Sequence, residues 1–226
     1  MEVAAARPTL EAHDLYRFYH AGEEETLALR GVSLAIAAGE TVAVMGPSGS
    51  GKSTLLACLA GLDEPDGGYV VVDGTRLTRR SEGDRATIRA RKIGILLQSG
   101  NLIGHLTVAE NVALQLQLAH RSTGKRVSEL LRAVGLETRG GSRADHLSGG
   151  ETARAGLAIA LAVDPPLILA DEPTGEVDAQ TEKRLLEMLD RRKAAGGATL
   201  VATHSEALAA WADRVIRLHD GRVVNE

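Results

Sequence analysis

The chain has 226 residues, 44% of them hydrophobic and 25% charged, with a formal net charge of −4. That length allows one large domain with a buried apolar core, and the composition disfavours the disordered and collagen-like classes. The mild acidity gives no electrostatic footprint for nucleic acid, whose binders concentrate Lys and Arg on one face. We therefore expect no nucleic-acid partner.

The cysteine count and the hydropathy pattern restrict the class of protein further. The single cysteine, Cys58, leaves no internal disulfide and no Cys-x-x-Cys metal site, which is consistent with a reducing compartment. Residues 1–14 have no positive start followed by an apolar stretch, so we expect no secretory signal. Polar side chains interrupt the apolar run at 106–119, well short of the roughly 18 to 20 residues that span a bilayer. Any membrane span is expected in a partner.

The first predicted elements are strands mixed with one helix. Residues 40–45 form a β-branched run, and helical character resumes at 52–62 after a Gly/Ser stretch, which predicts strand, loop and helix. A turn at 63–68 precedes a predicted strand at 69–72, and Asp73-Gly74 signals a hairpin. Helix-forming segments prevail from Ser81 to Val163, notably at 108–120 and 127–136. This stretch is predicted to be a mostly helical insertion, although the run at 93–97 before Gln98 is strand-like.

The last third of the chain predicts a parallel sheet. Short apolar runs at 167–170 and 199–202 are typical of strands buried on both faces. A predicted helix at 182–195 joins them in a strand–helix–strand crossover, and 214–226 contains two short strands around Asp220-Gly221. The whole pattern indicates an α/β fold, one compact domain with a helical lobe.

The loop between the first predicted strand and helix fits the pattern G-x-x-x-x-G-K-S/T, in the context that this motif requires. Its glycines let backbone N–H groups surround phosphate oxygens, and the following helix adds its positive N-terminal end. The lysine would supply an ammonium group and the serine a hydroxyl for Mg²⁺. A Gly-rich connector with an exposed lysine is the alternative. The loop residues are Gly46, Pro47, Ser48, Gly49, Ser50, Gly51, Lys52 and Ser53.

An apolar strand at 167–170 ends in two consecutive acids, Asp171 and Glu172. A phosphate loop needs such a carboxylate at the end of a neighbouring strand. Asp171 would hold Mg²⁺ through water, and Glu172, which points the other way, could polarise an attacking water. Acids at a strand end often serve only surface solubility, but this strand is too apolar to be exposed.

Residues 148–151 read Ser-Gly-Gly-Glu, the form of a helix capping box. In it the Ser148 hydroxyl caps an amide three residues on, and Glu151 reaches back to the amide of Ser148. The start of a helix concentrates unpaired N–H groups and positive dipole, so it is also an anion site. Because Glu151 folds onto Ser148, we expect it to organise this site and leave the glycine amides and the Ser148 hydroxyl for an anion.

These motifs together resemble the nucleotide-binding domains of ABC ATPases, and the likeness covers nearly the whole chain. Phrases such as "AGLDEPDGG" and "LADEPTGEVDAQT" resemble the branch for lipoprotein release, macrolide export and cell division. The residues that carry the resemblance, in order, are Gly46 to Thr54, Gln98, Leu147 to Glu151, Leu167 to Glu172, Asp178 and His204.

The resemblance implies a P-loop NTPase core with a mainly parallel sheet, an N-terminal antiparallel β subdomain and an inserted helical subdomain. All of 1–226 would be a single ABC ATPase domain, with the core in 1–94 and 157–226 and the helical signature subdomain in 95–156. It implies ATP and Mg²⁺ as cofactors, with Thr54 and Asp178 among the nucleotide contacts.

The same resemblance implies roles for three further residues. Gln98 would ligate Mg²⁺ and sense the γ-phosphate while its loop touches a transmembrane partner. His204 would contact the γ-phosphate and help Glu172 to hold the attacking water. Tyr19 falls where the family places an aromatic ring against adenine, with Phe18 and Tyr16 close enough to compete. Taken by themselves, these residue types are more often solvated or structural.

The resemblance also implies an assembly. Two copies would pair head to tail and place Ser148, Gly149 and Gly150 of each copy against the γ-phosphate held by the other. The second copy is expected to be identical, with a paralogue left open. Separate permease subunits with a large extracytoplasmic domain would hold the pair at the cytoplasmic face of the membrane. ATP-driven signalling through a membrane partner without transport is the alternative function.

A soluble chromosome or repair ATPase of the same superfamily is a further alternative. Such proteins insert a long coiled coil or zinc-binding segments between the loop that carries the glutamine, here Gln98, and the signature motif, here Leu147 to Glu151. Here Gln98 and Ser148 are 50 positions apart (148 − 98), without sustained heptads.

Departures from the family pattern include Glu176 in 175–178, Ala153-Arg154 after the signature, 144–146 without the usual proline, and Ile159 in place of an arginine.

Overall fold

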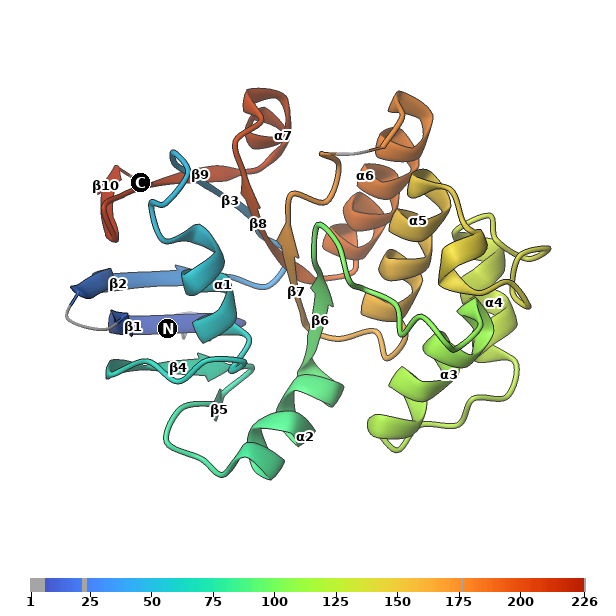
Figure 1. Ribbon diagram of the computed structural model, residues 1–226, viewed down its shortest axis with the longest axis horizontal. Helices are drawn as coiled ribbons and strands as arrows, with labels where there is room; N and C mark the ends of the chain where they lie inside the picture. Colours follow the sequence, from blue (N-terminus) through green and yellow to red (C-terminus); the bar gives the residue numbers. More distant parts are fainter. Residues whose placement is uncertain (1–6, 22–23, 176, 226) are drawn as a thin grey trace, which may run out of the picture.

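The computed structural model describes residues 7–21, 24–175 and 177–225, which form two sheets and a group of helices (Figure 1). The larger sheet has six strands in the order β10-β9-β3-β8-β7-β6. All neighbouring pairs in it are parallel except β10 and β9. Its strands are β3 (Thr41–Met45), β6 (Ile93–Leu96), β7 (Leu167–Asp171), β8 (Ala198–Thr203), β9 (Arg214–His219) and β10 (Arg222–Asn225).

The central strands of this sheet are buried along their length. Every residue of β3 and of β8 is buried, as expected for parallel strands covered on both faces. Side chains of a strand alternate between the two faces. In β7, Leu167 and Leu169 therefore join one apolar cluster, whereas Ile168 and Ala170 join another. One strand thus contributes to two cores.

The first core lies between the two sheets, around α1 (Lys52–Leu59). The smaller sheet is antiparallel in the order β2-β1-β4-β5. Cys58 of α1 is fully buried in this core, where burial raises the pKa of its thiol to about 12. The strands are β1 (Leu10–Ala21), β2 (Glu24–Ile36), β4 (Gly67–Val72) and β5 (Thr75–Arg76).

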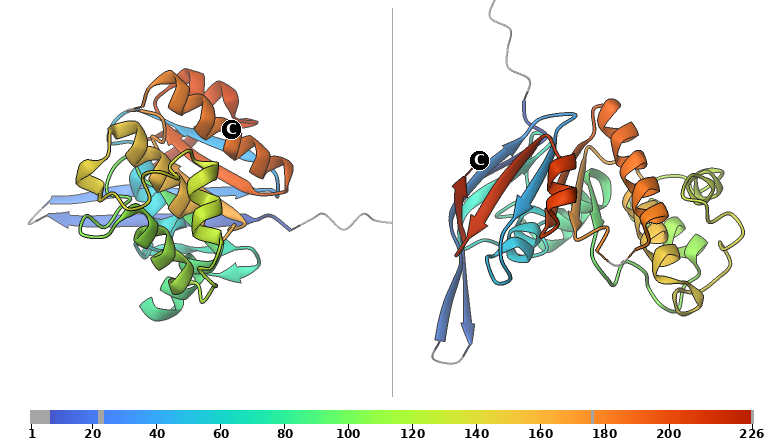
Figure 2. Two further views of the ribbon diagram at one scale, coloured as in Figure 1. Left: turned by 90° about the vertical axis from the view of Figure 1, so that its right-hand side faces the viewer. Right: turned by 90° about the horizontal axis from the view of Figure 1, so that it is seen from above.

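The second core lies on the other face of the large sheet, where most of the helices gather (Figures 1 and 2). It includes apolar side chains from α3 (Val108–Leu118), α4 (Arg126–Ala133), α5 (Gly149–Ala160) and α6 (Ala179–Ala194). The other helices are α2 (Glu82–Lys92), the 3-10 helix η1 (Ala144–His146) and α7 (Glu206–Trp211). Among the residues described, no helix has both the length and the apolarity needed to cross a membrane.

The structure confirms the predicted α/β class, the parallel core sheet, the antiparallel N-terminal sheet and the hairpins at Asp73-Gly74 and Asp220-Gly221. The stretch from Ser81 to Val163 is mostly helical, as predicted, and the strand-like run before Gln98 forms β6, the edge strand of the large sheet. The range 95–156 begins inside β6 and ends inside α5.

Candidate active site

The phosphate loop connects β3 to α1, and two of its glycines have no room for a side chain. A Cβ on Gly46 would lie 2.2 Å from the carbonyl oxygen of Leu218. Gly51, the N-cap of α1, has φ +102°, and a Cβ there would lie 2.5 Å from the oxygen of Ala28. No side chain among the described residues caps α1. The first amides of this helix therefore keep their capacity for an anion.

The ammonium group of Lys52 lies over this loop. Its Nζ donates hydrogen bonds to the carbonyl oxygens of Gly46 at 2.7 Å and of Pro47 at 3.0 Å. Lys52 also lines the cavity beside the loop, where a bound phosphate would meet both its ammonium group and the helix N-terminus.

Ser53 and Asp171 come together although they are 118 residues apart in the chain. The Ser53 hydroxyl donates to Oδ2 of Asp171 over 3.2 Å. Burial raises the pKa of the Asp171 carboxyl above its ordinary value. Hydroxyl and carboxylate oxygens suit Mg²⁺, which takes one or two carboxylates and shares its other positions with phosphate and water. The Ser53–Asp171 pair therefore has the oxygen donors for a magnesium ion whose other positions would be filled by a nucleotide and water. Among the described residues, no three or more His, Cys, Asp or Glu side chains are grouped so that they could hold a metal by themselves.

Glu172 follows Asp171 and turns away from it, as the alternation along a strand predicts. Its carboxylate accepts hydrogen bonds from the Thr203 hydroxyl at 2.8 Å and from the backbone N–H of His204 at 2.8 Å. Oε1 also lies 2.6 Å from Nδ1 of His204. Glu172 has φ +44°, a strained value for a residue with a side chain. The backbone conformation of Glu172 and its three contacts together fix the direction in which this carboxylate points.

The registers of the parallel strands explain why these groups meet. Met45 of β3 is paired with Thr203 of β8, and Asp171 of β7 with Ala202 of β8. The carboxyl ends of three neighbouring strands therefore open at one edge of the sheet. At that edge lie the phosphate loop, the two acids and His204, whose side chain is 78% exposed.

Gln98 follows β6, whose last residue, Leu96, is paired with Ala170 of β7. Gln98 therefore lies at the same edge of the sheet. The side chain of Asn101 shapes this loop: it accepts from the N–H of Leu97 at 2.8 Å and donates to its carbonyl at 2.6 Å. Asn101 also packs on α5, where a Cβ on Gly156 would lie 3.0 Å from it. Sequence reasoning missed Asn101. Its only signal was an asparagine after Gly100 in a loop.

Tyr19 lines a cavity of about 470 Å³ that the phosphate loop also lines. Its ring is 38% exposed, and burial of the rest raises the pKa of the phenol. Tyr16, an alternative candidate for the adenine contact, instead lies against Gly31 and Gly67. The cavity walls are Tyr19, 26–28, Arg30, Ser48, Gly49, 51–54 and the turn Asp220-Gly221. Thr54 therefore lies in this wall.

The structure confirms the capping box at the start of α5. The Ser148 hydroxyl accepts from the N–H of Glu151 at 3.3 Å, and Glu151 accepts from the N–H of Ser148 at 2.9 Å. Arg139 adds an ion pair with Glu151 at 2.9 Å. The Ser148 N–H and the Arg139 guanidinium together lower the pKa of Glu151. Arg139 comes from outside the motif, and no local pattern could have revealed it.

Asp178 lies beside the signature and caps α6 through the backbone N–H groups of Gln180 and Thr181, each at 3.0 Å. A Cβ on Gly150 would approach Oδ2 of Asp178 to 3.2 Å. Arg154 donates to the Thr181 hydroxyl at 2.9 Å, which ties the first turns of α5 and α6 together. Glu176, the predicted departure nearby, lies outside the described residues.

The signature lies apart from the phosphate loop of the same chain. Figures 1 and 2 both place α1 and α5 on opposite sides of β7. Gly149 and Gly150 form the first turn of α5, with Ser148 and Gly149 exposed to solvent. One chain therefore brings together the loop, the acids and His204, but leaves Ser148, Gly149 and Gly150 elsewhere.

A second cavity, of about 450 Å³, lies between α2, β6, α3, α5 and the loop that holds Gln98. Ile159, which stands where the family has an arginine, forms part of its wall and makes it less polar. Leu97 and Leu118 also line it and are 39% and 56% exposed. Exposed leucines that line a cavity are typical of a protein-binding surface.

Comparisons with known proteins agree with one another. A family model described as "ABC transporter" matches residues 29–175. An uncharacterized ABC transporter ATP-binding protein of Thermotoga maritima is 41% identical over 220 residues, 96% of this chain and 94% of that protein. The lipoprotein-releasing system ATP-binding protein LolD of Geobacter metallireducens is 41% identical over 95% of this chain and 97% of its own length.

A longer relative and a solved structure extend this likeness. The macrolide export ATP-binding/permease protein MacB of Hyphomonas neptunium is 37% identical over 97% of this chain, which spans 34% of that protein. The dimeric post-hydrolysis structure of the ATP-binding cassette MJ0796, bound to ADP and Pi, superposes with a TM-score of 0.91 at 37% identity. It covers 96% of this chain and 97% of its own.

The capping box generates a pH prediction. The contacts of the ionised Glu151 lower its pKa in the folded chain, so they stabilise the fold above the unfolded pKa of about 4.3 and are lost as the pH falls through the lower folded value. Glu151→Gln should therefore be less stable than the natural chain at pH 7, and this difference should shrink as the pH falls below about 4.3. Urea unfolding from pH 7 to pH 3 measures the difference.

The matched control is Glu187→Gln, which changes an exposed glutamate of α6. It should differ from the natural chain equally at both pH values. A stability gap for Glu151→Gln that stays constant from pH 7 to pH 3 would show that the charge of Glu151 does not stabilise the helix start.

Proposed function

The chain belongs to the ABC transporter family, and from that premise we propose that it is the ATP-hydrolysing subunit that powers a separate transmembrane permease. The observation that carries the proposal is the meeting of the phosphate loop, the Ser53–Asp171 pair and the Glu172–His204 pair at the ends of three adjacent strands. Each group there has a defined task in phosphoryl transfer to water.

The phosphate subsite binds through charge and backbone amides. The backbone N–H groups of the loop other than Pro47, which has none, and the N-terminus of α1 surround the phosphates, and Lys52 neutralises part of their charge. Ser53, Asp171 and Gln98 supply the oxygens for Mg²⁺, which when bound neutralises charge on the phosphate oxygens. Tyr19, in the cavity wall beside the loop, offers its ring to the adenine base.

Glu172 acts as the general base. Its carboxylate accepts a proton from the water that attacks the γ-phosphate, and the contacts from Thr203 and His204 hold it in the direction of that water. His204 bridges the carboxylate and the γ-phosphate, because one ring nitrogen contacts Glu172 while the exposed remainder of the ring is free to meet phosphate.

The signature completes the site of a second copy. Ser148, Gly149 and Gly150 present an exposed helix start, away from the phosphate loop of their own chain, and Asp178 lies against Gly150. A head-to-tail pair brings each signature to the γ-phosphate of the other chain. Support comes from the dimeric form in which the similar cassette MJ0796 is described. The second copy is proposed to be identical.

Hydrolysis then drives the membrane partner. Because the closed pair binds ATP and ADP with different affinity, turnover alternates the partner between two states. The cavity beside Gln98 receives a segment of the permease, and its exposed leucines support this role. We place the pair at the cytoplasmic face of the membrane, on permease subunits with a large extracytoplasmic domain. Support for a permease partner comes from the similar protein named as a macrolide export ATP-binding/permease protein.

A switch without transport is the second candidate for the same site. In that case ATP turnover changes the membrane partner, and no molecule is moved. Reconstitution of the chain with its membrane partner separates the two candidates: turnover with movement of a substrate supports transport, and turnover alone supports the switch.

Glu172→Gln tests the general base. The amide keeps the shape of the side chain but cannot accept a proton, so ATP turnover should fall by about 100- to 10,000-fold. ATP binding should persist and an ATP-bound dimer should accumulate. Phosphate release and size-exclusion chromatography with ATP measure both effects. Unchanged turnover would remove Glu172 from this role.

Ser148→Arg tests the shared site. A bulky cation at the start of α5 should block the dimer and abolish turnover, while ATP binding to the monomer persists. Ser81→Arg is the matched control, because Ser81 is an exposed N-cap on α2 with the same capping bond. If Ser148→Arg dimerises with ATP and turns over like the control, the shared-site model fails.

Leu118→Glu tests whether the second cavity, beside Gln98, binds the membrane partner. A charge at this exposed position should weaken association with the membrane subunit by about tenfold, because apolar contacts dominate such interfaces. ATP binding by the isolated chain should stay as it is. Val224→Glu is the control, since Val224 is 54% exposed but lies on β10, away from the cavity. Equal association of both variants in detergent pull-downs would place the interface elsewhere.

A further inference from the structure

The ring of Tyr19 is held by two charged side chains. The Tyr19 hydroxyl donates to Oδ2 of Asp63 at 2.7 Å, and Nε of Arg17 donates to the same oxygen at 2.8 Å. The guanidinium carbon of Arg17 also lies over the ring, 4.6 Å from its centroid. Arg17 forms a further ion pair with Asp66 at 3.0 Å. Tyr19, Arg17 and Asp63 each contact the other two, and these three residues are here called the ring clamp.

The ring clamp is fastened to the helix that begins at the phosphate loop. The backbone N–H groups of Leu62 and Asp63 donate to the carbonyl oxygen of Ala57 in α1, at 2.9 and 3.2 Å. Helix α1 has only eight residues between the loop and this end. Asp63 therefore links the position of the Tyr19 ring to that of the phosphate loop through one short rigid element.

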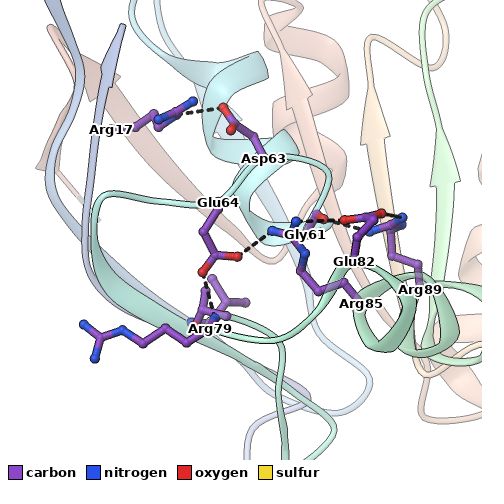
Figure 3. A network of polar contacts seen from close by, with 10 residues as sticks. Arg17, Gly61, Asp63, Glu64, Arg79, Glu82, Arg85 and Arg89 are labelled. Carbon is purple, nitrogen blue, oxygen red and sulfur yellow. Dashed lines mark hydrogen bonds and ion pairs between the residues drawn. The ribbon is translucent and has the colours of Figure 1, made fainter.

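The turn that follows α1, residues 60–66, also contacts α2 and the segment just before it, as Figure 3 shows. Glu64 pairs with Arg85 at 2.5 Å and accepts from the N–H of Arg79 at 2.7 Å. Arg89 donates to the carbonyl of Gly61 at 2.7 Å. These contacts fix the backbone around Asp63. They hold the turn between α1 and β4 and touch neither Tyr19 nor Arg17.

The ring clamp is also shielded more than an ordinary surface ion pair. The side chains of Arg17 and Asp63 are 21% and 24% exposed. Partial burial strengthens such contacts, whereas fully exposed pairs contribute little. Neither residue lines the cavity that Tyr19 shares with the phosphate loop. They contact the ring and leave the cavity side of it to a ligand.

We propose that Arg17 and Asp63 are positioning residues, which hold the Tyr19 ring at a fixed offset from the phosphate loop so that the base and the polyphosphate of one nucleotide bind together. A ring fixed before binding costs less ordering than a mobile one when the base stacks on it. The proposal rests on the proposed function, because it requires a nucleotide in this cavity. It adds a role for two residues outside every motif of the site.

The test compares ATP with inorganic tripolyphosphate, which has the phosphates but no base. Calorimetry with Mg²⁺ on the full chain gives the Kd of each ligand for the natural chain, Asp63→Ala, Arg17→Met and Tyr19→Phe. We expect the Kd of ATP to rise about fivefold in the first two variants, as for the loss of one hydrogen bond or cation–π contact. Tripolyphosphate should change less than about twofold, because α1 and the loop remain. Tyr19→Phe, which keeps the ring, should fall in between.

Glu64→Gln is the matched control, since it weakens the same turn on the α2 side without touching the ring clamp. It should leave both Kd values as they are. Equal weakening of ATP by Glu64→Gln and Asp63→Ala would overturn the proposal, and so would a parallel loss of ATP and tripolyphosphate in Asp63→Ala. Thermal unfolding checks each variant, and if Asp63→Ala does not fold, Arg17→Met and Tyr19→Phe decide the question.

The natural chain separates failure of this proposal from failure of the proposed function. If it binds tripolyphosphate as tightly as ATP, the base gains nothing from the ring and the positioning role is wrong, while the phosphate site stands. If it binds neither ligand, the proposed function fails, and the ring clamp with it.

Discussion

The site depends on one constraint, the burial of β7 and β8 on both faces. A strand between two apolar cores cannot shift by one residue, because Leu167 and Leu169 would exchange cores with Ile168 and Ala170. This fixes the register with β8 and, through it, with β3. Asp171 therefore meets Ser53, and Glu172 meets Thr203 and His204, because buried hydrophobic side chains of the strands favour a single alignment.

The chemistry of the acids follows from that alignment. Asp171, the last residue of β7, points to the phosphate loop, and Glu172 points to the end of β8. The strained backbone at Glu172 is tolerated because its N–H donates to the carbonyl of Ala202 at 2.9 Å and its carboxylate has three partners. Two consecutive carboxylates thus have different neighbours.

Local patterns predicted local structure well. The phosphate loop and the Ser148–Glu151 capping box each follow from a few consecutive residues, and the structure confirms the capping box with both of its hydrogen bonds. The strand-like run before Gln98 likewise forms a strand, β6. Contacts between distant segments could not be foreseen: Arg139 on Glu151, Asn101 on α5 and Asp63 on Tyr19 depend on packing that no spacing encodes.

Helix α5 meets three parts of the molecule along its length. Its first turn is the signature, its middle touches Asn101 through Gly156, and its end approaches β6 so closely that a Cβ on Gly94 would lie 2.3 Å from the oxygen of Ala160. A close-packed interior transmits displacement instead of absorbing it. A displacement of the loop that holds Asn101 is therefore expected to move α5 as one rigid body or to break the Asn101 contact. Because the first turn of α5 carries Ser148, Gly149 and Gly150, a push against the middle of this helix would also shift that turn.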